Sequence, residues 1–375
     1  MLPYGRQSID PSDLLAVQEV LEGDWLTTGP HVEAFERDLS TWTGGHDVVA
    51  VTSGTAALHV AYAAAGVGPG DEVVTSPMTF VATASCAVLL GAKVVFADVE
   101  EDTANLDPEA AAAVVTSRTK VVAAVDYAGH PAEYDQLQAV TAESDILLLA
   151  DAAHSIGSTY KGTSVGALAD LTTLSFFPTK NMTTAEGGAV VIAERQDLVR
   201  RAREFRTIGL VRDRARQRYP EEGPWHQEVH EFGLNYRLPD VLCALGSSQL
   251  RRLPSFILRR AQLTARYNEL LRDVEGIRLP TQRSHVVPAW HLYPVRVREG
   301  RRRHVFDAMR AAGIGVQVNY VPVYWHPVFE DLGYRRGQCP IAERFYEEEL
   351  SLPLYPTLTE QEQDRVVAAL VAALT

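Results

Sequence analysis

Three features are scarce in this sequence: cysteine, lysine and long apolar runs. The cysteines Cys86, Cys243 and Cys339 are odd in number and widely spaced, so they indicate neither a disulfide framework nor a zinc site, and a reducing compartment is expected. No apolar run approaches the ~18 residues that a membrane-spanning helix needs. The polar start "MLPYGRQSID" lacks the apolar core of a signal peptide. We therefore expect a cytoplasmic protein with no metal and no membrane partner.

The charge balance is acidic, with a formal net charge of −13 at pH 7. Binding to nucleic acid or to an anionic membrane normally requires a basic surface, so we expect neither partner. The arginine-rich stretch "RRAREFRTIGLVRDRARQR" (200–218) is the local exception. It fits either a solvated helix followed by a mobile loop or a rim that attracts a phosphorylated small molecule.

Lysine is rarer than its usual counterpart arginine. Four of the 35 lysines and arginines are lysine, namely Lys93, Lys120, Lys161 and Lys180. Arginine stays protonated in proteins, whereas a lysine can lose its proton and act as a nucleophilic amine when its surroundings lower its pKa. Lys180 lies in the loop sequence "SFFPTKNMTTAEGGAVV" (175–191), between an aromatic strand end and a Gly-Gly pair. It is the candidate reactive amine, with simple solvation as the alternative for a single loop lysine.

The order of apolar runs predicts an α/β fold. Between residues 47 and 193, short runs such as "DVVAVTSG" and "DILLLADAAH" alternate with helical patterns. Strands that are apolar throughout and separated by helices indicate a mainly parallel sheet that is covered on both faces. A long helical pattern over 240–275 then leads into further strands and helices. We predict a large domain with an N-terminal arm over residues 1–240 and a smaller α/β domain over 241–375.

Several helices carry recognisable end signals. Asp10 as the cap and Pro11 at the first position predict a helix over 11–22. Further helices are predicted near 133–143, 196–206, 301–312 and 360–374, and the stretch 208–240 is predicted to be irregular.

Two familiar motifs fail on their context. "HQEVH" (226–230) lacks the glutamate directly after the first histidine, so a metalloprotease site is not indicated. "GVGPGD" (66–71) follows a helical pattern instead of a strand, so it is a turn and not a dinucleotide-binding loop.

Three features at predicted strand ends suggest one chemistry. Gly54 and Thr55 begin a helix after a strand, where free N–H groups favour a phosphate, although many α/β turns look alike. Asp151 follows a buried strand, where a carboxylate needs a cation or strong donors; a helix cap is the alternative. A pyridoxal phosphate enzyme requires a phosphate cradle, an acidic partner for the ring nitrogen and a lysine amine. Together with Lys180, these residues predict such an enzyme.

The sequence also resembles a known family. "DAAHSIGSTYKG", "SFFPTKNMTTAEGGAV" and "GLNYRLPDVLCALGSSQL", in this order and spacing, are similar to the DegT-type nucleotide-sugar aminotransferases. The likeness extends over nearly the whole chain, from "YGRQSID" to "SLPLYP". It implies a fold type I pyridoxal phosphate enzyme that works as a homodimer with shared active sites.

By position, the resemblance implies roles for individual residues. Lys180 would form the Schiff base and shuttle protons, Asp151 would pair with the pyridine nitrogen, and His154 would lie beside the ring and its 3-oxygen. The implied cofactor-binding residues also include Gly54, Thr55 and Ser175 at the phosphate, Phe80 on the ring face, and Asn235 reaching the phosphate of the neighbouring subunit. The implied substrate-binding residues are Tyr4, Thr27, Arg237, Tyr320 and His326.

The substrate is less well defined than the chemistry. "VDYAG", "PWHQEVHEFGLNYR" and "GVQVNYVPVY" resemble the pseudaminic-acid branch, which transfers an amine from L-glutamate to carbon 4 of a UDP-linked 4-keto-6-deoxy-N-acetylhexosamine. Phe177 and Ala185 depart from the histidine and glycine of many relatives. Another dTDP- or UDP-linked keto-sugar or an aminocyclitol remains an alternative substrate, because one fold hosts many reactions. A non-catalytic pyridoxal phosphate protein is the other alternative.

Overall fold

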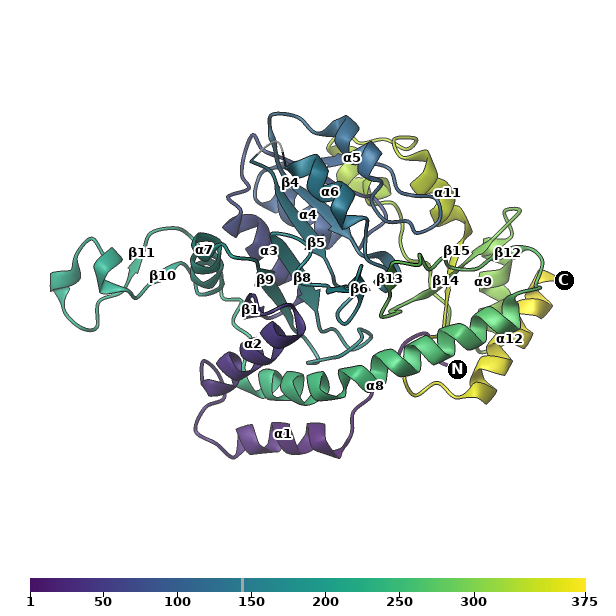
Figure 1. Ribbon diagram of the computed structural model, residues 1–375, viewed down its shortest axis with the longest axis horizontal. Helices are drawn as coiled ribbons and strands as arrows, with labels where there is room; N and C mark the ends of the chain where they lie inside the picture. The colour runs from purple at the N-terminus through teal and green to yellow at the C-terminus, as the bar shows by residue number, and fades with distance from the viewer. Residues whose placement is uncertain (143–144) are drawn as a thin grey trace.

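The fold is built on one seven-stranded sheet (Figure 1). The structure is a computed structural model that describes residues 1–142 and 145–375. In spatial order the strands are β1 (Asp47–Val51), β9 (Gly188–Ile192), β8 (Leu171–Ser175), β5 (Leu147–Asp151), β4 (Thr119–Val125), β2 (Glu72–Thr75) and β3 (Lys93–Phe96). All neighbours from β8 to β3 are parallel, whereas β9 is antiparallel to both β8 and β1. The predicted α/β class with a mainly parallel sheet is confirmed.

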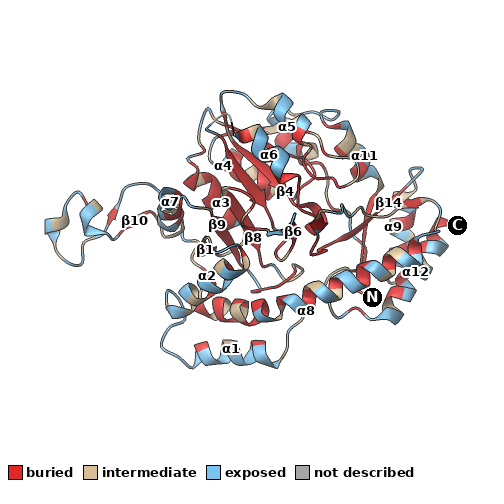
Figure 2. Cartoon of the chain, in the orientation of Figure 1, coloured by how far each residue is buried: buried red, intermediate tan, exposed pale blue. Residues whose placement is uncertain are grey.

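Both faces of this sheet are buried, which explains why its strands are apolar throughout (Figure 2). Successive side chains of a strand point to opposite faces; Val48 and Ala50 therefore join one core cluster, and Val49 and Val51 join the other. The first face packs against α2 (Pro30–Trp42), α5 (Pro108–Val114), α6 (Tyr134–Thr141) and the first half of α8 (Asp240–Leu271). The second packs against α3 (Gly54–Ala64), α4 (Ala82–Leu89) and α7 (Gln196–Arg206).

A smaller antiparallel sheet forms a separate core at the C-terminal end of α8 (Figure 1). Its strands are β12 (Ile277–Arg278), β14 (Tyr293–Val297) and β15 (Glu349–Leu352), and it is covered by α9 (Arg302–Ala311) and α12 (Glu360–Leu374). Leu2 belongs to this core and pairs with Ile314, so the N-terminus crosses from the large sheet to the small one. The division at residues 240 and 241 stays a prediction.

The helix predictions compare closely with the structure. Asp10 caps α1 (Pro11–Leu21) in a capping box with Asp13. The predicted helices near 196–206, 301–312 and 360–374 are α7, α9 and α12, and the long pattern forms α8, which ends at Leu271. The predicted helix near 133–143 is α6, and residue 143 lies outside the described residues.

The predicted irregular stretch is largely a projecting arm (Figure 1). It leaves the body after α7 and contains the two-residue strands β10 (Leu210–Val211) and β11 (Glu228–Val229) and the short helices η2 (Arg214–Arg216) and η3 (Pro220–Glu222). Trp225 and Phe232 are strongly exposed on it.

The remaining elements are short. They are β6 (Thr159–Tyr160), β7 (Thr163–Ser164), β13 (Val286–Val287), η1 (Tyr127–Gly129), η4 (Val323–Trp325), α10 (Pro327–Asp331) and α11 (Pro340–Glu348). Over residues 1–142 and 145–375, no helix combines the length and the apolar composition that crossing a membrane demands.

Candidate active site

A cavity of about 430 Å³ opens at the carboxyl end of the parallel strands, the edge where ligands collect in open α/β sheets. The ends of β4, β5 and β8 and the beginning of α3 contribute to its wall. Most of the predicted site residues line it, namely Tyr4, Gly54, Thr55, Phe80, Asp151, His154, Ser175, Lys180 and Tyr320.

The N-terminus of α3 offers a cradle for a phosphate. Ser53 caps the helix through a hydrogen bond from Ala56 N to Ser53 Oγ of 3.0 Å. Gly54 lies so close to Ser175 that an added Cβ would stand 2.8 Å from Ser175 Cβ. The glycine therefore lets the helix end and the serine hydroxyl face the same space. Free N–H groups and the helix dipole at such an end attract an anion.

Asp151 is buried where β5 ends, and it has donors for both oxygens. Thr83 Oγ1 donates to Oδ2 at 2.6 Å, and Ala153 N donates to Oδ1 at 3.3 Å. Burial raises the pKa of Asp151, while the bonds from Thr83 and Ala153 and the charge of Lys180 act in the opposite direction. A cation placed against this carboxylate, such as a protonated pyridine nitrogen, would favour its ionised form further.

Lys180 lies on the loop after β8 and lines the same cavity. Burial lowers its pKa to about 8, and the negative charge of Asp151 opposes part of that shift. The other lysines are elsewhere: Lys93 and Lys120 lie at the beginning of strands, and Lys161 pairs with Asp135 at 2.5 Å. Within the described residues, Lys180 is thus the lysine that the cavity contains.

His154 combines with residues from distant segments. Its Nε2 lies 3.0 Å from the hydroxyl of Tyr320, and its ring lies 4.4 Å, between centroids, from that of His291. Burial holds the pKa of both histidines well below the ordinary value, so both rings are neutral. His154 Nδ1 is buried and has no hydrogen-bond partner among the described residues, which leaves it available to a ligand of the cavity.

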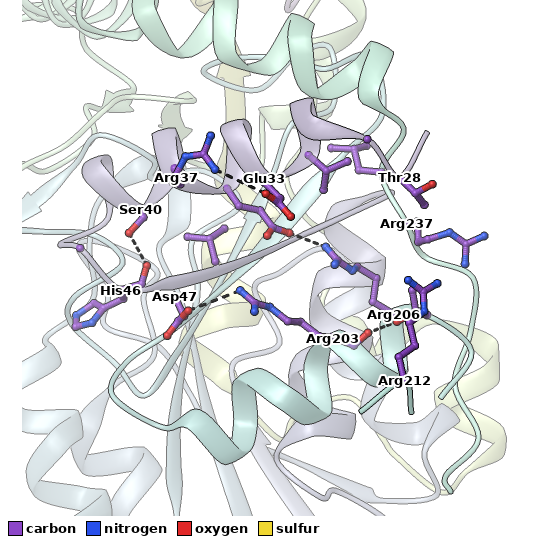
Figure 3. Close-up of a pocket in the computed structure, with 17 residues that line it drawn as sticks. Thr28, Glu33, Arg37, Ser40, His46, Asp47, Arg203, Arg206, Arg212 and Arg237 are labelled. Atoms are coloured by element: carbon purple, nitrogen blue, oxygen red, sulfur yellow. Dashed lines mark hydrogen bonds and ion pairs between the residues drawn. The ribbon is translucent and has the colours of Figure 1, made fainter. Parts of the chain in front are cut away.

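Four predicted residues do not line this cavity. Arg237 lines a second cavity of about 600 Å³ between α2, the start of β1 and α7 (Figure 3). Asn235, two residues before Arg237, is exposed and forms an antiparallel β-bridge with Thr207. Thr27 is exposed, and half-buried His326 connects η4 to α10. Their assignments stay predictions.

The second cavity accounts for part of the arginine-rich stretch. Arg206 pairs with Glu36 at 2.6 Å and Arg203 approaches Asp47 at 3.7 Å (Figure 3). These carboxylates compensate the two arginines, so the cavity is of mixed charge. In the projecting arm, His226 and His230 both bond to Glu228, at 3.1 and 2.5 Å.

Several cavity residues escape prediction from the sequence alone. They are Thr79, Thr83, Glu186, His291, Gln317 and Asn319. Thr79 and Thr83 stand four residues apart, their hydroxyls 2.7 Å from each other, and a pair of threonines at helical spacing was the only local signal.

The sheet order and this lysine–aspartate–helix arrangement define the α/β fold of the fold type I aminotransferases. Residues 7–371 match the DegT/DnrJ/EryC1/StrS aminotransferase family. The chain belongs to this family of sugar aminotransferases, which confirms the resemblance at family level.

Individual relatives cover all or nearly all of the chain. The spore coat polysaccharide biosynthesis protein SpsC of Bacillus subtilis (strain 168) is 37% identical over 374 residues, covering 98% of this chain and 96% of SpsC. The putative sugar aminotransferase Spr1654 of Streptococcus pneumoniae, in its apo-form, has a TM-score of 0.94 at 29% identity, with 100% of this chain and 97% of that one covered. Its PLP- and PMP-forms, each with a TM-score of 0.93, agree with the predicted cofactor.

A third relative bears on the predicted branch of the family. Helicobacter pylori PseC, an aminotransferase involved in the biosynthesis of pseudoaminic acid, has a TM-score of 0.92 at 28% identity, with 100% of this chain and 99% of that one covered.

Thr83 generates the first testable prediction. Thr83→Val should slow amino transfer by roughly 10- to 100-fold, because a hydrogen bond to a charged group contributes about 1.5–3 kcal/mol. Thr83→Ser, which keeps the hydroxyl, is the matched control and should stay within a few-fold of the unaltered protein. Single-turnover absorbance of the bound cofactor measures the rate. Equal rates for Thr83→Val and Thr83→Ser would show that the Thr83 hydroxyl does not contribute to amino transfer.

Proposed function

We propose that this protein is a pyridoxal phosphate-dependent aminotransferase that moves an amino group from L-glutamate to a nucleotide-linked keto-sugar. One observation carries the proposal: a single cavity holds Lys180, Asp151 and the N-terminus of α3. Family membership supports the same chemistry. Within the family, we propose carbon 4 of a UDP-linked 4-keto-6-deoxy-N-acetylhexosamine as the acceptor, supported by the sequence likeness to the pseudaminic-acid branch and by the fold of PseC.

The cavity residues fit the cofactor. The backbone N–H groups at Gly54 and Thr55 and the hydroxyl of Ser175 would hold its phosphate. Phe80, 57% exposed at the cavity, offers an aromatic surface for the ring. Bound there, pyridoxal phosphate supplies a ring that withdraws electrons from the carbon next to a bonded amine.

Asp151 and His154 would set the charge around the ring. A buried carboxylate stabilises a proton on the facing ring nitrogen, because the opposite charges interact strongly in a site that excludes water. His154 remains neutral, so it adds no competing positive charge and can orient a ring oxygen through a hydrogen bond.

Lys180 would act first as a nucleophile and then as a base. With a pKa of about 8, roughly one lysine in ten is neutral at pH 7, against about one in 2,500 at an ordinary pKa. The neutral Nζ would hold the cofactor through its aldehyde carbon, with water as the leaving group, and, once released, would move a proton between the cofactor and the sugar carbon on the other side of the transferred nitrogen. The same burial that lowers the pKa therefore prepares both steps.

Lys180→Ala should abolish amino transfer and leave the fold intact, since the side chain contributes chemistry and little packing. Lys161→Ala is the matched control, because Lys161 is exposed and pairs with Asp135 on the surface. Activity with a keto-sugar acceptor, together with circular dichroism, checks both variants. Activity retained in the Lys180→Ala variant would contradict the assignment.

The sugar is tested with a panel of nucleotide-linked 4-keto and 3-keto sugars and a keto-cyclitol. With the UDP-linked 4-keto-6-deoxy-N-acetylhexosamine, we expect a product whose mass corresponds to replacement of the keto oxygen by an amine. L-Glutamate should shift the absorption of the bound cofactor from that of its aldehyde form to that of its amine form. Amination of another member alone would correct the substrate. Cofactor conversion with no acceptor used would leave the donor half of the proposal standing, whereas no conversion at all would favour a non-catalytic protein.

We also propose a homodimer whose active sites are shared. Neither Asn235 nor Arg237 lines the cavity of Lys180, and Arg237 lines the second cavity instead (Figure 3). This supports their predicted role in the site of a neighbouring subunit. The strongly exposed Phe232, three residues before Asn235, supports a covered surface there.

Mixing variants tests the shared site. Lys180→Ala and Asn235→Ala proteins, each with little activity, should regain activity when mixed, because a mixed dimer contains one site with both residues intact. Fluorescence-labelled subunits control for exchange. If exchange is complete and the mixture is no more active than its components, Asn235 serves its own subunit or none.

A further inference from the structure

The wall of the active-site cavity includes a short segment, residues 317–320, outside the ladders of the seven-stranded sheet and of the smaller sheet. Gln317, Asn319 and Tyr320 line the cavity. The segment is joined to β15 by a single bridge between Gln317 and Ser351. Its position therefore depends on side chains that bind its backbone.

Asn319 is the point where these side chains converge. Asn319 N donates to Glu349 Oε2 at 2.6 Å, and Asn319 O accepts from the hydroxyl of Tyr127 at 2.5 Å. Its side-chain Nδ2 donates to the Tyr4 hydroxyl at 2.9 Å and to Ser351 Oγ at 3.0 Å. The next residue, Tyr320, carries the hydroxyl that meets His154 Nε2 at 3.0 Å.

Glu349 is the fully buried carboxyl group in this network. Its Oε1 lies 2.5 Å from Ser351 Oγ. Arg296, opposite Glu349 in the β14–β15 ladder, pairs with Glu348 at 2.7 Å and approaches Glu101 at 3.8 Å instead. In the described part of the chain, no basic side chain forms an ion pair with Glu349.

A carboxylate in this environment would be costly, because a buried charge without a cation loses its hydration with little compensation. Burial raises the pKa of Glu349 to about 8, and the bonds from Ser351 and Asn319 and the distant charge of Arg302 oppose the shift only in part. The other titratable groups that face it are the phenols of Tyr4, Tyr127 and Tyr320, which are uncharged near neutral pH.

We propose that Glu349 is a positioning residue that works as an uncharged carboxyl: it holds Asn319, and with it Tyr320, against the active-site cavity. An uncharged carboxyl still accepts hydrogen bonds through its oxygens, as Glu349 does from Asn319 N on Oε2 and from the Ser351 hydroxyl on Oε1. Tyr320 then fixes the ring of His154. The effect on amino transfer rests on the proposed function, whereas the uncharged state of Glu349 does not.

Glutamine is the informative replacement, because it keeps the shape of the side chain and an oxygen that can accept from Asn319 N, without an ionisable proton. A carboxyl with a folded pKa above its unfolded value stabilises the fold at low pH and loses that contribution as pH rises toward the folded pKa. We therefore expect the melting temperature of the Glu349→Gln apoprotein, minus that of the unaltered apoprotein, to increase as the pH is raised from 5 to 8.5.

Glu133→Gln is the matched control. Glu133 is also buried, but it pairs with Arg283 at 2.7 Å and with His285 at 2.9 Å, and its pKa is lowered. Its glutamine variant should melt below the unaltered protein at every pH in this range, because Arg283 stays charged throughout. A Glu349→Gln curve that also lies below the unaltered protein, by a margin that does not shrink with pH, would mean an ionised Glu349 and overturn the proposal.

The positioning role is read from kcat and KM. Glu349→Gln should stay within about twofold of the unaltered protein in kcat/KM, and Glu349→Ala should lose at least tenfold, chiefly in kcat, since Tyr320 and His154 shift beside the reacting atoms. If Glu349→Ala does not fold, equality of Glu349→Gln with the unaltered protein still supports the role, and a tenfold loss in Glu349→Gln contradicts it. Absence of activity in every protein, unaltered included, would count against the proposed function and leave the melting curves to decide the state of Glu349.

Discussion

The arrangement of the site depends on keeping the carboxylate of Asp151 in the interior at the end of β5. The strand delivers it there because its preceding residues are apolar and buried on both faces of the sheet. A charge in that position is tolerated only where donors and cations surround it. Thr83 from the start of α4, Ala153 and Lys180 meet this demand from three different segments. In the proposed function, this carboxylate would fix where the ring nitrogen and the reactive amine lie.

The same low-polarity surroundings act in opposite directions on the neighbouring groups. They lower the pKa of Lys180 to about 8 and keep His154 neutral, whereas they raise the pKa of Glu349 to about 8. Asp126, which follows β4 and lies beside Asp151, is a further example, because burial raises its pKa to about 7. It accepts a hydrogen bond of 2.5 Å from Oγ of Ser155, the residue directly after His154 in the sequence. Buried polar groups thus hold the loops that line the active-site cavity.

The sequence predicts the parts of this site whose signals are local. Lys180, Asp151 and the turn at Gly54 each follow an apolar strand, and the carboxyl ends of parallel strands meet at one edge. Thr83, Asn319 and Glu349 carry no such signal, because each becomes important only when a distant segment folds against it. The helices are predicted well where caps mark their ends, as at α1. The projecting arm has no periodic pattern, so the sequence predicts only that it is irregular.

The central claim is that the amine of Lys180, activated by burial beside Asp151, is the group that bonds to the cofactor. Borohydride reduction of the protein loaded with pyridoxal phosphate, followed by peptide mass mapping, tests it most directly. The account predicts a phosphopyridoxyl mass on Lys180 and none on the other three lysines. The label on Lys93, Lys120 or Lys161, with Lys180 unmodified, would contradict it.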